Sequence, residues 1–338
     1  MEAPTSFGNV FCDLMFMQDY TIEAGWHDAR IVPYGPIALD PAATVLHYGQ
    51  EIFEGTKAYR RPDGRINLFR PWENAARFNR SAARMAMPAV DVEDHVQAMS
   101  AWVSAVANWV PSEPGTSLYI RPTMIATQAH LGVSASNRYL HYIIGGPVAG
   151  FQGRSFGAVG VQISDEHVRA VKGGTGAAKT GGNYAAGLLA AGNARALGYQ
   201  QVLWLDGVHR RYVEEVGGMN IAFVRGNEII TPALSGSILE GITRDSVLRL
   251  APDLGYPVRE KQIDVDELLR NIDAGHITES FGIGTAAVIA PVNRFGYKGV
   301  DHHVGDGKPG PVTLALYAAL TDIQYGRVPD PYGWTLIP

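Results

Sequence analysis

A single lysine flanked by glycines is the residue of this sequence best suited to carry chemistry. Lys179 lies within residues 173–186, GGTGAAKTGGNYAA, directly before an Ala- and Leu-rich stretch. Glycine has no side chain that could cover its neighbours, and it permits tight turns. An amine in this setting can reach a bulky planar ligand. A flexible glycine loop with a solvated lysine fits these residues equally well.

The same segment also approximates a phosphate-binding P-loop. Residues 173–180 nearly fit the pattern G-x-x-x-x-G-K-[ST], which binds nucleotides. The fit fails at Ala178, where the pattern requires glycine, and residues 167–172 are too polar for the buried strand that precedes such a loop. The apolar run from Val202 to Asp206 resembles the acidic strand of an ATPase, but short apolar runs that end in aspartate are common. A nucleotide-binding module is therefore the alternative from another class of proteins.

Further motifs spread along the chain indicate the kind of protein to which the lysine segment belongs. They are HYG at 47–49 with FEG at 53–55, LFRPWENAAR at 68–77, SLYIRP at 117–122, KTGGNY at 179–184, EEVGGMN at 214–220, GITRD at 241–245 and GTAA at 284–287. With them the sequence resembles the branched-chain amino acid aminotransferases, fold-type IV enzymes that use pyridoxal phosphate, over nearly its whole length. One glycine motif could match by chance, but seven motifs in the right order do not.

The resemblance implies an α/β fold of α+β character in two domains. We expect a smaller N-terminal α/β domain at residues 1–150 and a larger C-terminal domain with a mixed sheet at residues 151–338, with pyridoxal 5'-phosphate in the cleft between them. A stretch rich in glycine and small residues, 145–157, supports this boundary. A length of 338 residues is enough for two hydrophobic cores.

Local patterns predict helices and strands around the motifs. Pro71 suits a first helical turn, so a helix should start near Arg70 and stop before Pro88, with Arg77, Arg80 and Arg84 on one side. Residues 183–197 are predicted as one helix closed by Gly198. Further strands are predicted at 201–205, 212–216, 219–224 and 228–231, the last three in an antiparallel sheet, and further helices at 241–251, from about 264, and at 311–325.

The resemblance gives Lys179 and Glu215 the central chemical roles. Lys179 would form the internal aldimine with the cofactor and then move the proton between the substrate Cα and the cofactor C4'. The positive charge of the cofactor lowers the pKa of a neighbouring amine, which leaves it able to accept a proton. Glu215 would bond the pyridine nitrogen. Because neighbouring strand residues face opposite ways, Glu214 should meet solvent. Lys172 lies outside the motif and is expected at the surface.

The phosphate of the cofactor is expected at a helix start, where backbone N–H groups and the helix dipole favour an anion. Gly241, Ile242 and Thr243 supply that start. Arg77 matches the phosphate arginine of the family, whereas Arg80 and Arg84 fit a solvated helix face. The remaining cofactor residues implied by the resemblance are Tyr184, which would bond the ring oxygen, Leu239 and Thr285.

The substrate pocket implied by the resemblance is apolar, which suits leucine, isoleucine and valine side chains. Its residues are Tyr48, Phe53, Tyr119, Arg121, Ala286 and Ala287, with Leu131 and Val133 reaching in from a partner subunit. Two positions depart from relatives: Phe151 stands where some have tyrosine, and Gly218 where some have threonine. The pocket should therefore lack two hydroxyls and be roomier.

Composition excludes several other classes of function. The net charge is −5 and the basic residues form no cluster, so nucleic acid is not an expected partner. No apolar stretch reaches about 20 residues, and the N-terminal residues lack the pattern of a signal peptide, so we expect no membrane association and a cytoplasmic enzyme. Cys12 is the only cysteine and the histidines are dispersed, so neither a disulfide, nor the redox pair of mammalian relatives, nor a metal site is expected.

The sequence thus predicts a homodimeric transferase that exchanges the amino group of leucine, isoleucine or valine with 2-oxoglutarate, forming branched-chain 2-oxo acids and L-glutamate. An aminotransferase with a broader or aromatic donor is an alternative within the same fold. A D-amino-acid transaminase or an aminodeoxychorismate lyase fits less well, because LFRPW, YIRP and the C-terminal ALTDIQYGR resemble the branched-chain subgroup.

Overall fold

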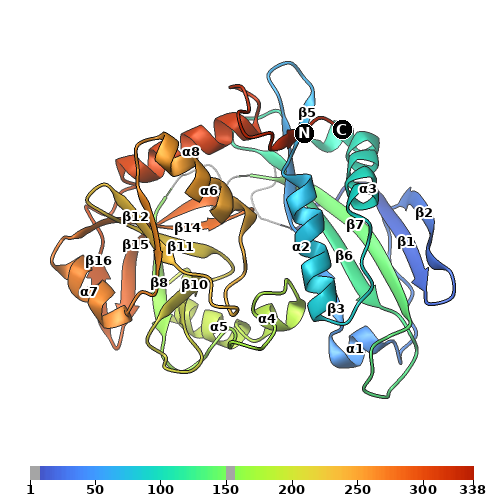
Figure 1. Cartoon of the computed structure of the whole chain (residues 1–338), viewed down its shortest axis with the longest axis horizontal. Helices are drawn as coiled ribbons and strands as arrows, with labels where there is room; N and C mark the ends of the chain where they lie inside the picture. Colours follow the sequence, from blue (N-terminus) through green and yellow to red (C-terminus); the bar gives the residue numbers. More distant parts are fainter. Residues whose placement is uncertain (1–7, 150–156) are drawn as a thin grey trace. The chain divides into compact units, whose positions relative to one another are not determined.

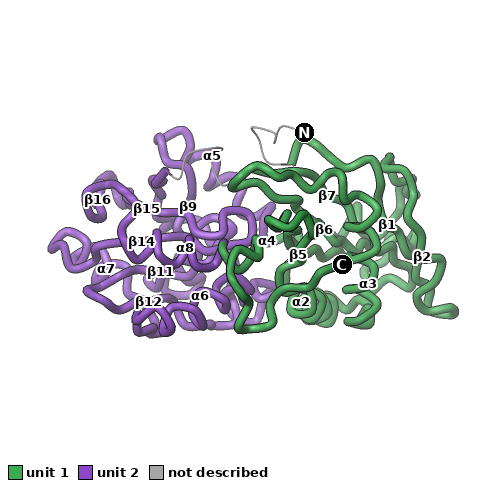
Figure 2. Tube along the Cα trace, turned by 90° about the horizontal axis from the view of Figure 1, so that it is seen from above, with its two compact units in different colours: residues 1–153, 178–182, 322–338 green, residues 154–177, 183–321 purple. Residues whose placement is uncertain are grey.

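A computed structural model describes residues 8–149 and 157–338. The pocket residue Phe151 and the domain boundary predicted at residue 150 lie outside these residues. Contacts divide the chain into two compact units (Figure 2). Unit 1 comprises Met1–Gly153, Ala178–Gly182 and Asp322–Pro338, and unit 2 comprises Arg154–Ala177 and Asn183–Thr321.

This division differs from the predicted domains in two places. Residues 178–182 and 322–338 were expected in the C-terminal domain, but both segments belong to unit 1. The first is hydrogen-bonded to strand β3 (Glu51–Phe53), and the second contributes strand β17 (Thr335–Leu336), which pairs with β5 (Ile66–Phe69). Long-range backbone bonds of this kind leave no local signal in the sequence.

Unit 1 is built on an eight-stranded sheet whose paired strands run antiparallel (Figure 1). Its strands lie in the order β17-β5-β4-β6-β7-β1-β2, and β3 pairs with β6. The bounds of the other strands are β1 Leu14–Thr21, β2 Gly25–Pro33, β4 Thr56–Arg60, β6 Ser117–Ala126 and β7 Arg138–Val148. The helices of the unit are α1 Thr44–Tyr48, α2 Pro71–Arg84, α3 Val92–Ala105 and the short 3-10 helix η1 Ala107–Trp109.

Helix α2 starts at Pro71 and ends at Arg84, before Pro88, as predicted. Arg80 and Arg84 are exposed, whereas Arg77 is buried, so only Arg77 points away from solvent. Helix α3 was not predicted. Its N-cap is Asp91, whose carboxylate accepts hydrogen bonds from the N–H groups of Glu93 and Asp94, the arrangement that stabilises a helix start.

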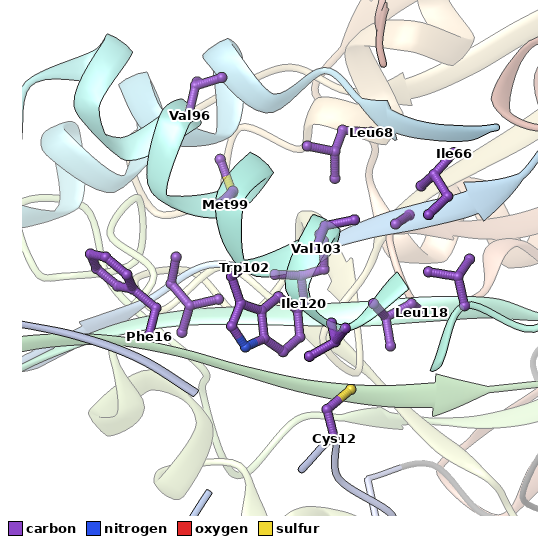
Figure 3. Packing of buried hydrophobic residues seen from close by; sticks show 14 of the residues in the cluster. Cys12, Phe16, Ile66, Leu68, Val96, Met99, Trp102, Val103, Leu118 and Ile120 are labelled. Atoms are coloured by element: carbon purple, nitrogen blue, oxygen red, sulfur yellow. The ribbon is translucent and has the colours of Figure 1, made fainter. Parts of the chain in front are cut away.

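The hydrophobic core of unit 1 lies between α3 and one face of the sheet (Figure 3). Met99, Trp102 and Val103 of the helix pack with Leu118 and Ile120 of β6, and all five are fully buried. Successive side chains of a strand point to opposite faces, so the residues between these two must face the other way. The core therefore fixes Tyr119 and Arg121 on the opposite face of β6.

Unit 2 is built on a nine-stranded mixed sheet in the order β10-β9-β8-β15-β14-β11-β12-β13, with β16 paired to β15. The pairs β8 with β9, β8 with β15 and β12 with β13 are parallel, and the other pairs are antiparallel. The mixed sheet was predicted. The strands are β8 Val159–Ser164, β9 Gln201–Leu205, β10 Val213–Val216, β11 Asn220–Arg225, β12 Glu228–Pro232, β13 Val258–Lys261, β14 Ile277–Gly284, β15 Val288–Tyr297 and β16 Val300–His303.

The helix predicted over residues 183–197 is wrong as a single element. The structure has two helices here, α4 Gly181–Ala185 and α5 Leu188–Ala196. Between them the N–H of Gly187 donates to the carbonyl of Tyr184 at 3.1 Å, and a Cβ at Gly187 would lie 3.1 Å from the ring of Trp204. A side chain at this position would crowd the ring, so glycine fits the close approach between the two helices.

The remaining helices follow the predicted positions. They are α6 Ile242–Asp253, α7 Val265–Asp273 and α8 Pro311–Gln324. Asp264 caps α7 by accepting a hydrogen bond from the N–H of Glu267 at 2.9 Å, the arrangement expected from the sequence. Among the residues described, no helix is both long and apolar enough to cross a membrane.

Candidate active site

The segment that carries Lys179 is fixed against unit 1. The N–H of Lys179 donates to Oγ of Ser81 at 2.9 Å, and the carbonyl of Lys179 accepts from the N–H of Phe53 at 2.9 Å. Its amine nitrogen lies 4.9 Å from the centroid of the Phe53 ring. Lys179 is half-buried, whereas Lys172 is exposed, as predicted. A solvated lysine on a flexible glycine loop does not describe this segment.

Three predicted pocket residues gather near this amine. Nη2 of Arg121 donates to the hydroxyl of Tyr119 at 2.9 Å, and Cζ of Arg121 lies 4.5 Å from the centroid of Phe53. A guanidinium over an aromatic face is held by the quadrupole of the ring. Unit 1 therefore presents a cation, a phenol and an apolar ring beside the amine of Lys179, a combination able to hold a carboxylate next to an apolar side chain.

Lys57 lies on the same face of the sheet and was not predicted. It is paired directly with Tyr119 across strands β4 and β6, so the two side chains point the same way. Lys57 is buried, and burial lowers the pKa of its amine to about 7. The next residue, Ala58, lies in the core. Because neighbouring residues of a strand face opposite ways, this pattern could have placed Lys57 on the other face of the sheet.

Arg77 is bound to a buried carboxylate. Its Nε lies 2.7 Å from Oε1 of Glu54 and its Nη2 lies 2.8 Å from Oε2, and Glu54 is fully buried. This bidentate pair uses two of the five N–H groups of the guanidinium. At the next residue, Gly55, a Cβ would overlap the Tyr119 hydroxyl. The FEG motif thus anchors Arg77 and leaves space for Tyr119.

Tyr48 contacts the loop that was predicted to serve a partner subunit. Tyr48 ends helix α1, and its hydroxyl donates a hydrogen bond to the carbonyl of Leu131. The side chains of that loop face solvent in this chain, with Leu131 62% and Val133 86% exposed. Both apolar side chains are therefore available for contact with a further surface.

In unit 2, Glu215 on β10 is a buried carboxylate held on several sides. Its Oε1 accepts from the N–H of Leu239 at 2.8 Å and from Nδ2 of Asn220 at 3.4 Å, and its Oε2 lies 2.8 Å from Nε of Arg169. The arginine offsets the cost of burying the charge. Arg169 was not predicted, because no motif covers it and only the fold brings it to Glu215.

The expectation that Glu214 meets solvent is wrong. Glu214 is 4% exposed, and its Oε1 accepts hydrogen bonds from the hydroxyls of Ser237 and Ser235. Burial raises the pKa of this carboxyl, and the hydrogen bond from Ser237 acts in the opposite direction. A second segment of the chain, which carries Ser235 and Ser237, covers Glu214.

Asn220 joins the predicted phosphate segment to Glu215. Its Nδ2 also donates to the carbonyl of Leu239 at 3.0 Å, and a Cβ at Gly241 would overlap its Oδ1. Gly241 is the N-cap of α6, and no side chain at that position caps the first N–H groups, which begin at Ile242 and Thr243. A helix start of this kind attracts an anion.

Two further predicted groups lie in unit 2. A Cβ at Gly218 would lie 3.5 Å from the ring of Tyr184, so these residues are neighbours. Thr285 and Ala286 are half-buried and Ala287 is buried in the turn between β14 and β15. Val288, which follows, has φ 63, a left-handed conformation that costs a β-branched residue on the order of 1–3 kcal/mol. Strain of this kind is concentrated at functional sites.

Comparison with known proteins decides the family. Residues 51–295 match the family described as amino-transferase class IV. The chain is 51% identical over 331 residues to the branched-chain-amino-acid transaminase 1 of Bacillus subtilis, covering 98% of this chain and 93% of that protein. It is 50% identical to the branched-chain-amino-acid aminotransferase of Mycolicibacterium smegmatis, covering 98% and 92%. The chain belongs to the branched-chain amino acid aminotransferases.

Solved aminotransferases of this family share the fold. The enzyme of Escherichia coli has a TM-score of 0.78 and 27% identity, covering 96% of this chain and 98% of that one. The enzyme of Thermobaculum terrenum, solved in its PLP-form, has a TM-score of 0.78 and 25% identity over the same shares. The predicted fold-type IV architecture is therefore confirmed, and the P-loop alternative is wrong. Strand β8 ends at Ser164, so no strand leads directly into residues 173–180.

Proposed function

We propose that this aminotransferase transfers the amino group of L-leucine, L-isoleucine or L-valine to 2-oxoglutarate, reversibly, giving branched-chain 2-oxo acids and L-glutamate. The observation that carries the proposal is the amine of Lys179, held by backbone bonds beside Phe53, Tyr119 and Arg121. Relatives about half identical over nearly the whole chain are named branched-chain-amino-acid transaminase or aminotransferase, which supports the choice of amino donor.

We propose pyridoxal 5'-phosphate as the cofactor, and the groups present fit it. The chain offers an amine at Lys179, a buried anchored carboxylate at Glu215 and a helix start at Ile242. When bound, the cofactor supplies an electron sink for the carbanion at the substrate Cα. The solved enzyme of Thermobaculum terrenum is a PLP-form, and another solved relative contains pyridoxamine 5'-phosphate, the amino form of the same group.

Different residues of this chain would have different roles around that cofactor. Lys179 would hold it covalently and move the proton at the substrate Cα, and Glu215 would keep its ring nitrogen protonated. For the phosphate we propose two groups, each described within its own unit. Unit 2 offers the N–H groups at the start of α6, and unit 1 offers the guanidinium of Arg77, which Glu54 holds in place. The assignment also includes Tyr184 at the ring oxygen, with Leu239, Gly241, Thr243 and Thr285.

The proposed substrate pocket combines apolar walls with one fixed cation. Phe53 supplies an apolar surface, and Arg121 with Tyr119 supplies donors for a carboxylate. Arginine is suited to this role because it stays charged and binds carboxylates in a planar, bidentate way. The other proposed contacts are Tyr48, Gly218, Ala286 and Ala287, with Leu131 and Val133 from a partner subunit.

Steady-state kinetics with a panel of amino donors and 2-oxoglutarate tests this function. We expect leucine, isoleucine and valine to have the highest kcat/KM and to differ modestly, because one methylene in an apolar slot is worth about 1–3 kcal/mol. Aspartate and lysine should be poor donors. Methionine and phenylalanine should be measurable but weaker than leucine. An aromatic donor with a higher kcat/KM than all three branched ones would contradict the branched-chain assignment.

We propose that the enzyme works as a homodimer in which the 131–133 loop completes the pocket of its neighbour. Light scattering should give about twice the 36.5 kDa of the chain. Val133→Asp should weaken the dimer and lower activity together, since the side chain is 86% exposed here and would become buried. Ile22→Asp, at an exposed position of the same unit, is the control. Full activity in a monomer at high dilution would refute the dimer.

We also propose a cytoplasmic location. Cys12 is the only cysteine of the chain, so no internal disulfide can form. Burial raises the pKa of its thiol to about 12, which keeps the sulfur in its unreactive protonated form. A chain without disulfide or reactive thiol is suited to a reducing compartment.

A further inference from the structure

Glu51 holds the two residues that directly follow Lys179. Its carboxylate accepts a hydrogen bond from the N–H of Gly181. Its backbone carbonyl accepts a hydrogen bond from the hydroxyl of Thr180 at 2.7 Å. Both bonds lie within unit 1, to which residues 178–182 belong. One residue of strand β3 therefore restrains the chain on the C-terminal side of the lysine.

The glycine at position 181 accommodates the carboxylate of Glu51. A Cβ at Gly181 would overlap an oxygen of Glu51, so glycine leaves room for the carboxylate in the position that it occupies here. Moving a carboxyl out of water normally costs free energy unless new hydrogen bonds or charges compensate. Here burial raises the pKa of Glu51, while the bond from Gly181 and the charge of Arg121 act against that rise.

Glu51 completes a set of bonds on both sides of Lys179. Ser81 accepts from the N–H of the lysine and Phe53 donates to its carbonyl, each at 2.9 Å. The bonds to Glu51 fix the next two residues, so the backbone from 179 to 181 cannot rotate without breaking several bonds. The position of the amine 4.9 Å from the centroid of the Phe53 ring depends on this backbone.

We propose that Glu51 is a positioning residue for Lys179, acting through the backbone of Gly181 without touching the reacting atoms. The proposal deepens the function proposed above and rests on it in one respect, the catalytic role of the lysine. Its geometric part, that the carboxylate restrains residues 179–182, stands independently of that role. Small misplacements of a catalytic group have large effects, since a displacement of about 1 Å can cost a hundredfold in rate.

The test compares Glu51→Ala, Glu51→Gln and the control Glu23→Ala, a glutamate exposed at a hairpin of the same unit. Hydrogen exchange of the peptide around residues 179–182 is measured on the protein stripped of cofactor. In Glu51→Ala we expect exchange at Gly181 to be about twofold to tenfold faster, the effect of one lost hydrogen bond. Glu51→Gln keeps an oxygen that accepts the same bond and should stay near wild type, as should the control and the peptide of β6.

Kinetics on the loaded enzyme provide the second measurement. Glu51→Ala should lower kcat about tenfold or more, because the proton-moving amine is displaced. The KM of the amino donor should change less than kcat, because Phe53, Tyr119 and Arg121 remain, although Arg121 loses the charge of a nearby carboxylate. Glu51→Gln should restore most of kcat.

Unchanged exchange at Gly181 in Glu51→Ala would overturn the proposal, as would a Glu51→Gln variant as defective as alanine in both measurements. A wild-type protein without transaminase activity would refute the proposed function instead, and the exchange data would still decide whether Glu51 restrains the segment.

Discussion

Replacing Lys179 with alanine should abolish transamination and remove the visible absorbance of the bound cofactor. The amine lies half-buried beside Phe53, and its backbone is bonded to Ser81 and to β3. Alanine keeps those backbone bonds, so the fold of the segment should survive. A positioned acid–base group alone contributes about 10²–10⁴-fold to a rate. Because the lysine would also hold the cofactor covalently, we expect a loss at or beyond the upper end of that range.

The matched control is Lys172→Ala, which removes the same charge seven residues earlier, at an exposed position. Both turnover and absorbance should stay close to wild type in this variant. Absorbance spectra and single-turnover rates of the two purified proteins are sufficient to compare them. An equal loss in both variants, or sustained turnover without Lys179, would refute the assignment.

Elements with a strong local signal were predictable from the sequence. Pro71 at a helix start and Asp264 at a cap act through their own backbone neighbours, so their patterns give the starts of α2 and α7. The break between α4 and α5 was missed, and the close approach of Gly187 to the ring of Trp204, which is distant in the sequence, left no local signal. A requirement imposed by another strand is invisible in the Ala- and Leu-rich pattern of the helix itself.

The candidate site was likewise only partly predictable from the sequence. Motif residues such as Phe53, Tyr119 and Arg121 were predicted as pocket residues and lie together within unit 1. Their supporting partners were not predicted. Arg169 comes from a stretch without a motif, and the cover over Glu214 comes from Ser235 and Ser237, which pack against β10 only in the fold. Alternation along a strand gives the direction of a side chain but not what covers it.

Replacing Glu215 with glutamine should leave cofactor binding intact and lower the rate by about an order of magnitude or more. A neutral amide cannot keep the ring nitrogen of the cofactor protonated, and each pKa unit of that support is worth about 1.4 kcal/mol, a factor of ten in rate. The amide oxygen can still accept the hydrogen bonds from the N–H of Leu239 and from Asn220. Geometry is thereby retained while the charge is lost.

The change also leaves the buried guanidinium of Arg169 without its carboxylate, although that side chain still donates to the carbonyls of Gly176 and Ser237. Removing one partner of a buried ion pair destabilises a protein by up to about 3–5 kcal/mol. Rates must therefore be measured well below the Tm of the variant, so that lost folding is not counted as lost catalysis. Cofactor titration by absorbance checks that binding remains.

The comparison with Glu214→Gln identifies which carboxylate serves the ring. Glu214 is also buried, but its partners are the hydroxyls of Ser235 and Ser237, which can donate equally to an amide oxygen. This variant should therefore keep a near wild-type rate. If Glu214→Gln instead loses rate while Glu215→Gln keeps it, the carboxylate facing the cofactor is Glu214, and the assignment of opposite faces along β10 must be reversed.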